Sequence, residues 1–282
     1  MHRTVTRRGL LAALFTLPLA ASAQAAGLER LFAPSADPWE RWLRHDPAST
    51  TVVDHALLDM VLERHVSRGV DGIARVDYRA LRTGRQPLDA YVARCAGVAV
   101  DGLNRNEQAA FWINLYNALT LRCVIDHWPV DSIRDIDISP GLFADGPWDA
   151  RLIVVAGERL SLNDIEHRIL RPLWREPRMH YALNCASLGC PDLRAGAWRG
   201  ADLERQLDEQ ARAFVNHPRG ARVEDGRLRV SSIYDWFRED FGADDLAVIA
   251  HIRAFAAPEL RSALDGIDSI AGDFYDWRLN GI

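Results

Sequence analysis

Apolar residues recur at helical spacing along most of the chain and alternate at strand spacing in only a few short segments. Apolar positions three and four residues apart predict helices over 28–44, 53–67, 88–96, 104–127, 162–171, 202–216, 232–241 and 244–256. Short or alternating apolar segments predict strands within 70–78 and over 151–155, 178–183, 221–223, 228–230 and 274–277. We expect Pro129 to close the longest helix, and Ser161 and Pro172 to bound the helix over 162–171.

The order of these elements predicts the fold class. Helices outnumber strands, and the strands on either side of Asp225-Gly226 form a hairpin rather than a βαβ unit. We therefore expect an α+β fold, with a single helix-rich domain and a small, mainly antiparallel sheet over 70–282. An N-terminal helical extension over 24–69 precedes it.

The first 26 residues have the pattern of an export signal. A basic start that includes the Arg7-Arg8 pair is followed by a short apolar stretch and two overlapping A-x-A cleavage sites. The arginine pair favours the twin-arginine route. We expect a signal peptide over 1–23 and a periplasmic or secreted protein. After signal removal we expect no integral membrane segment, because no later stretch has the roughly 18 apolar residues of a membrane span.

Composition excludes several kinds of chemistry. All 34 basic side chains are arginine, so Schiff-base chemistry, a pyridoxal-phosphate lysine and a P-loop lysine are ruled out. The formal net charge of -5 argues against nucleic acid as a partner. The four cysteines contain no C-x-x-C pair, and no cofactor or metal signature occurs, so we expect neither.

The helix over 104–127 carries three polar side chains on one stripe of an otherwise apolar surface. At about 100° per residue, Glu107, Asn114 and Asn117 share a face. Glu107 also lies three residues after Asn104, as in a capping box. The two asparagines need buried partners, which either a neighbouring loop or a substrate would supply. We take Glu107 as a candidate catalytic residue and Asn114 and Asn117 as candidate substrate-binding residues.

The helix over 162–171 has two contrasting faces. Glu166 shares the apolar side and is expected to be paired with arginine or protonated. His167 and Arg171 lie on the other side, which is either a solvated face with local ion pairs or the wall of a cleft. In the second case these two residues contact the substrate.

The segment from His180 to Cys190 is the most specific in chemical terms. Cys185 follows the predicted strand and begins a small polar loop, a common place for a nucleophile. His180 is its candidate base if the strand ends by about Leu183; otherwise His167 is. The alternatives for Cys185 are a disulfide with Cys190 and a buried thiol.

Three long motifs resemble a known family. They are the segments 106–119 (NEQAAFWINLYNAL), 162–171 (LNDIEHRILR) and 180–193 (HYALNCASLGCPDL), strengthened by 146–148, 231–233 and 275–277. Together they resemble the domain-of-unknown-function 547 family from Val76 to Asn280. This resemblance implies no agreed activity, so function has to come from the residues.

Two functions of different classes follow. The first is a thiol-dependent hydrolase or acyl transferase in which Cys185, His180 and Glu107 act on a small molecule or a peptide. The second is a non-catalytic periplasmic binding module with a Cys185–Cys190 disulfide. The state of the Cys185 thiol discriminates between them.

Overall fold

The computed structural model describes residues 34–141 and 146–282, and the predicted signal peptide lies outside these ranges. Within them the fold is α+β and rich in helices, as the sequence predicts. The strands form three separate small sheets rather than the single small sheet expected. None of the described helices combines the length and the apolar character needed to span a membrane.

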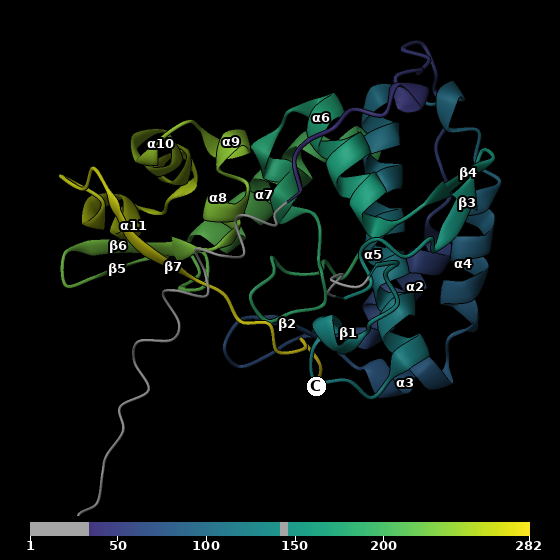
Figure 1. Ribbon diagram of the computed structural model, residues 1–282, viewed down its shortest axis with the longest axis horizontal. Helices are drawn as coiled ribbons and strands as arrows, with labels where there is room; N and C mark the ends of the chain where they lie inside the picture. The colour runs from purple at the N-terminus through teal and green to yellow at the C-terminus, as the bar shows by residue number, and fades with distance from the viewer. Residues whose placement is uncertain (1–33, 142–145) are drawn as a thin grey trace, which may run out of the picture.

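The N-terminal half is built around one long helix, α5 (Arg105–His127). Around it lie α2 (Ala56–His65), α3 (Tyr78–Thr83) and α4 (Gln86–Ala96) (Figure 1). The same half contains the 3-10 turns η1 (Glu40–Trp42) and η2 (Val100–Gly102). In the described part of the predicted extension, only η1 is helical before α2, so a continuous helix to residue 44 is wrong there. Helix α2 packs on α3 and α4.

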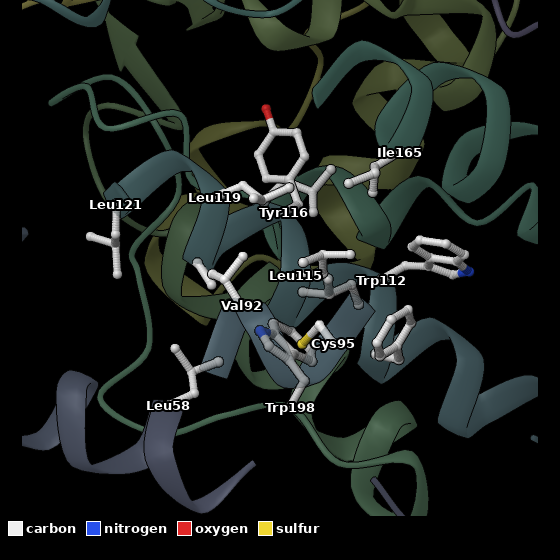
Figure 2. Close-up of a cluster of buried hydrophobic side chains, with 14 of the residues drawn as sticks. Leu58, Val92, Cys95, Trp112, Leu115, Tyr116, Leu119, Leu121, Ile165 and Trp198 are labelled. Carbon is white, nitrogen blue, oxygen red and sulfur yellow. The ribbon is translucent and has the colours of Figure 1, made fainter. Parts of the chain in front are cut away.

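Helix α5 begins and ends where the sequence predicts. The Asn104 side chain accepts a hydrogen bond from the Glu107 N–H at 3.0 Å, which caps the helix, and the helix stops at His127 before Pro129. Every side chain from Glu107 to Leu121 is buried, so the helix is covered on all sides. Figure 2 shows the cluster around it, in which Trp112 and Trp198 lie with Leu58 from α2 and Val92 from α4.

The helix predicted over 162–171 is wound more loosely than expected. Asp164–Leu170 forms a π-helix, η4, and the short helix α6 (Arg171–Trp174) continues through Pro172. The Ser161 hydroxyl accepts from the Asp164 N–H at 3.1 Å, so the predicted N-terminal cap is present. Pro172 lies in the first turn of α6 and does not stop the helix there, contrary to the prediction.

The strands form two hairpins and a three-stranded sheet. β1 (Val66–Arg68) pairs antiparallel with β2 (Ala74–Val76), and β3 (Ile153–Val155) with β4 (Glu158–Leu160). β5 (Ala221–Glu224) pairs antiparallel with β6 (Arg227–Ser231) around the predicted Asp225-Gly226 turn. β7 (Ile270–Phe274) joins β6 in parallel. This strand ends at Phe274, so it shares only that residue with the 274–277 segment for which the sequence predicts a strand.

The C-terminal half has a second apolar core. It lies between α7 (Leu203–Val215), α10 (Asp245–Phe255) and the three-stranded sheet, and includes Tyr181 and Phe214. Shorter helices complete it: α8 (Ile233–Trp236), α9 (Arg238–Phe241) and α11 (Pro258–Ala263). The helix predicted over 232–241 is thus two short helices. Two more 3-10 turns, η3 (Ile133–Asp135) and η6 (Gly200–Asp202), lie in the connections.

The strand predicted over 178–183 is wrong. Pro177–Tyr181 forms a 3-10 helix, η5, because the Glu176 carboxylate accepts from the Arg178 N–H at 3.0 Å and caps a turn that starts at Pro177. The turn packs against α7. His180 is therefore presented from a helical turn rather than from a pleated edge.

Candidate functional site

The polar stripe of α5 is occupied by main-chain hydrogen bonds. The Glu107 carboxylate accepts from the Val53 N–H at 2.8 Å and from the Gly200 N–H at 3.2 Å. Asn114 accepts from the Trp198 N–H and donates to the Trp198 carbonyl, both at 2.9 Å. These contacts tie two distant loops to the helix. They favour the loop-pinning alternative that the sequence leaves open for Asn114, and the Glu107 carboxylate binds loop main chain in the same way.

Asn117 holds the segment that leads to the cysteines. Its amide donates to the Ala182 carbonyl at 3.0 Å and accepts from the Asn184 N–H at 2.9 Å. Like Asn114, it is almost fully buried. The start of the Cys185 loop is therefore fixed to the core helix by a reciprocal pair of hydrogen bonds.

Cys185 and Cys190 form a disulfide, with their Cα atoms 6.3 Å apart. The sequence leaves this pairing open beside two others, and the bond means that Cys185 carries no free thiol in this state. Cys185 is partly exposed, whereas Cys190 is 3% exposed. Cys185 is thus the more exposed residue of the pair.

Two hydroxyl groups lie against the disulfide. The Tyr275 oxygen is 3.2 Å from the Cys185 sulfur and 3.1 Å from the Cys190 sulfur. The Ser187 hydroxyl is 2.9 Å from that of Tyr275 and 3.5 Å from the Cys185 sulfur. The Cys190 sulfur also accepts from the Cys185 N–H at 3.0 Å. Hydrogen-bonding groups therefore lie close to both sulfur atoms.

The C-terminal tail brings Tyr275 to this position. The tail runs from β7 towards the β1–β2 hairpin (Figure 1). It pairs with the cysteine loop through two main-chain hydrogen bonds of 2.8 Å: the Leu188 N–H donates to the Arg278 carbonyl, and the Gly189 N–H donates to the Asp276 carbonyl. A Cβ at Gly189 would lie 2.9 Å from the Tyr275 ring, so only glycine permits this approach.

His180 is held by carboxylates and aromatic rings. Its Nε2 lies 2.7 Å from Asp240, its Nδ1 lies 3.8 Å from Glu166, and its ring stacks on Phe237 with centroids 4.5 Å apart. Among the described residues no hydrogen bond joins His180 to Cys185. Its role as a base for that cysteine stays a prediction.

Arg171 and His167 are buried, so the solvated face considered for them is wrong. Arg171 donates to Asp240 at 2.5 Å and to Glu239 at 3.0 Å, and its guanidinium lies 3.0 Å from the His167 ring. Burial is the main cause that lowers the pKa of His167 to about 4. Burial alone would raise the pKa of Asp240, but hydrogen bonds from His180 and Arg171 lower it to about 2. The substrate contacts predicted for His167 and Arg171 would have to compete with these ion pairs.

The π-helix explains why the sequence misplaced these side chains. The faces were assigned at 3.6 residues per turn, whereas the Arg171 N–H bonds to the Glu166 carbonyl five residues earlier. Glu166 turns towards His180 and Tyr116 instead of an arginine. The Tyr116 hydroxyl points away from the apolar cluster in Figure 2. Burial raises the pKa of that hydroxyl, and the Glu166 charge raises it further.

A pocket of about 430 Å³ opens beside the disulfide loop. It lies between the β1–β2 turn, the loop at Leu188 and the tail after β7. Its lining combines charged and apolar side chains: Asp71, Ile73, Arg75, Leu188, Gly189, Arg219, Phe274, Tyr275, Asp276 and Arg278. Tyr275 therefore lines the pocket, and its hydroxyl contacts the disulfide.

Sequence reasoning missed the arginines of this pocket, and also Asp240. Arg75, Arg219 and Arg278 come from three separate parts of the chain, and none lies in a recognisable motif. Asp240 is 60 residues from His180. Only Tyr275 had a signal, as part of a motif in the family resemblance. Within 34–141 and 146–282, no group of three or more His, Cys, Asp or Glu residues is placed to hold a metal ion.

Comparison with known proteins gives one match. The model of the family described as "Protein of unknown function, DUF547" matches residues 100–215, from η2 through the disulfide loop to the end of α7. The motifs at 231–233 and 275–277 lie beyond this match. No curated protein and no solved structure matches the chain. Residues 100–215, which hold α5, the π-helix and both disulfide cysteines, are therefore the part of the chain that is similar to the DUF547 family.

Proposed function

We propose that this protein is an exported binding domain for a small peptide-like ligand that carries carboxylate groups. The observation that carries the proposal is the pocket of about 430 Å³ lined by Arg75, Arg219 and Arg278. Its volume is within the range of about 300–1,000 Å³ that small-molecule sites occupy. The Cys185–Cys190 disulfide favours binding over thiol-dependent hydrolysis, because it occupies the sulfur that hydrolysis would need.

The charges in and beside the pocket define the ligand class. Four guanidinium groups face three carboxylates: Arg68, Arg75, Arg219 and Arg278 against Asp71, Asp192 and Asp276. Guanidinium groups bind carboxylates through paired hydrogen bonds, and the aspartates suit an ammonium group. A short peptide with an acidic side chain carries one ammonium group and two carboxylates, so its net charge is negative. The charge balance therefore favours such a ligand.

Two buried N–H groups support an anionic ligand. Arg75 Nη1 and Arg219 Nε are buried and have no acceptor among the described residues. Buried donors are normally satisfied, and a carboxylate oxygen would satisfy them. Ile73, Leu188 and Phe274 supply an apolar lining that reduces the competition from water.

Export rests on the sequence pattern of residues 1–26 and is supported by the disulfide, since disulfides persist in oxidising compartments. Replacing Arg7 and Arg8 by lysine should retain the precursor in the cytoplasm if the twin-arginine route is used. Cell fractionation with an antibody to the protein measures this. Normal export of the double variant would exclude that route.

Calorimetric titration of the oxidised protein with the dipeptide alanylglutamate tests the binding function. Arg278→Gln should weaken binding about 10-fold, because a charged hydrogen bond to the ligand is lost. Arg253→Gln is the matched control, since Arg253 also pairs with a neighbouring aspartate, at 2.8 Å, but does not line the pocket. Alanylglutamine, which lacks the acidic side chain, should bind more weakly than alanylglutamate. No binding, or equal effects of both substitutions, would overturn the proposal.

A further inference from the structure

We propose that the Cys185–Cys190 pair is a thiol–disulfide exchange site for low-molecular-weight thiols, in which Cys185 is attacked and Cys190 is the leaving group. This inference goes beyond the binding function and does not depend on it. It rests on the unequal exposure of the two cysteines, on the hydrogen-bond donors near their sulfurs, and on the independent support of the loop.

Access selects the sulfur that is attacked. Cys185 is partly exposed at the start of the loop, whereas Cys190 is 3% exposed. An incoming thiolate must reach a disulfide sulfur along the S–S axis, so exposure decides which of the two reacts. The mixed disulfide therefore forms on Cys185.

Hydrogen-bond donors favour the departure of Cys190. The Cys185 N–H lies 3.0 Å from the Cys190 sulfur, and the Tyr275 hydroxyl lies 3.1 Å from it. A disulfide sulfur is a weak acceptor, whereas a thiolate is a strong, charged one, so these donors stabilise the opened pair more than the closed pair. The Ser187 hydroxyl, 2.9 Å from that of Tyr275, can donate to its oxygen and keep its hydrogen directed at sulfur.

The exchange is balanced over two steps. In the first, the thiolate of a small thiol attacks the Cys185 sulfur; a new S–S bond forms, the bond to Cys190 breaks, and its electron pair leaves with the Cys190 sulfur as a thiolate. In the second, the thiolate of another small thiol attacks the sulfur that the first small thiol contributed to the mixed disulfide. That bond to Cys185 breaks, and Cys185 is released as a thiolate. The protein gains two electrons, and two thiols leave as one small disulfide. The reverse sequence reoxidises the pair.

The loop keeps its shape without the covalent bond. The Asn184 side chain spans it, accepting from the Ala186 N–H at 3.0 Å and donating to the Pro191 carbonyl at 2.7 Å. The tail adds two main-chain bonds, from Leu188 and Gly189. Closing so short a loop stabilises the fold by only about 2 kcal/mol. Reduction should therefore leave the fold intact and both sulfurs in place.

Two single variants test which sulfur reacts. With oxidised glutathione at neutral pH, the Cys190→Ser variant should form a mixed disulfide at Cys185, identified by mass spectrometry of the folded protein. The Cys185→Ser variant should react at Cys190 at least 10-fold more slowly. The remaining thiols, Cys95 and Cys123, are an internal reference, because burial raises their pKa values to about 11 and about 12. Equal rates, or faster reaction at Cys190, would overturn the assignment.

The role of the donors has a separate readout. In the otherwise natural protein, Tyr275→Phe should slow reduction of the disulfide by glutathione about 10-fold, because the leaving thiolate loses a hydrogen bond. Tyr234→Phe is the control, since its hydroxyl bonds to Tyr181 at 3.0 Å and not to sulfur. Circular dichroism before and after reduction shows whether the fold persists. Equal reduction rates in the two variants would refute the role of the Tyr275 hydroxyl. A disulfide that is reduced only when the protein unfolds would show that it is a structural brace and not an exchange site.

Discussion

Removing the amide of Asn117 should destabilise the fold strongly, because both of its hydrogen bonds are buried. The Asn117→Ala change removes the bonds to the Ala182 carbonyl and the Asn184 N–H, at 3.0 and 2.9 Å. Each such bond contributes about 1 kcal/mol, and each stranded buried partner costs about 1–3 kcal/mol. We expect the free energy of unfolding to fall by about 3 kcal/mol. Urea unfolding followed by tryptophan fluorescence should then shift by about 1 M for a slope near 3 kcal/mol per M.

Asn216 provides a matched control for this change. It clamps main chain in the same way, donating to the Phe255 carbonyl at 2.9 Å and accepting from the Ala257 N–H at 2.6 Å, but it is exposed. Water replaces its bonds when they are lost, so Asn216→Ala should cost no more than about 1 kcal/mol. If Asn117→Ala proves no more destabilising than Asn216→Ala, the buried-clamp reasoning is refuted, and a ligand-binding role for Asn117 regains support.

Gly200→Ala should destabilise by about 2 kcal/mol in urea unfolding, because its Cβ would lie 2.7 Å from the Glu107 backbone nitrogen. Gly102→Ala, which meets no atom within 4 Å, should be near neutral, and equal effects would contradict the packing. Stability should also fall as pH drops from 6.5 to about 4, because three largely buried histidines have pKa values lowered over that interval and only the unfolded chain takes up their protons. They are His55, His167 and His251. Thermal melts across this range that do not change would show that the folded protein protonates them.

Local signals in the sequence predict much of the fold. Asn104 caps the long helix because the cap needs only a side chain and an N–H three residues away. Asp225 and Gly226 form the hairpin turn because both adopt positive φ, at 51° and 71°. The disulfide was one of the open alternatives, since only a few residues separate the two cysteines.

Features of the fold that depend on tertiary contacts could not be predicted from local signals. The period of the π-helix differs from the one used to assign its faces, so a solvated face was considered for His167 and Arg171, which are buried; Glu166 is buried as predicted. Apolar alternation over 178–183 suggested a strand, but the cap at Glu176 and the start at Pro177 form a turn. The pocket arginines and the Asp240 partner of His180 come together only through the chain's path.

A crystal structure of the oxidised protein with alanylglutamate bound would test the proposed function most directly. We expect the peptide in the pocket beside Tyr275, with its carboxylates on Arg75, Arg219 or Arg278 and its ammonium group near Asp71 or Asp276. Peptide bound elsewhere, or a pocket that stays free of peptide at saturating concentration, would contradict it.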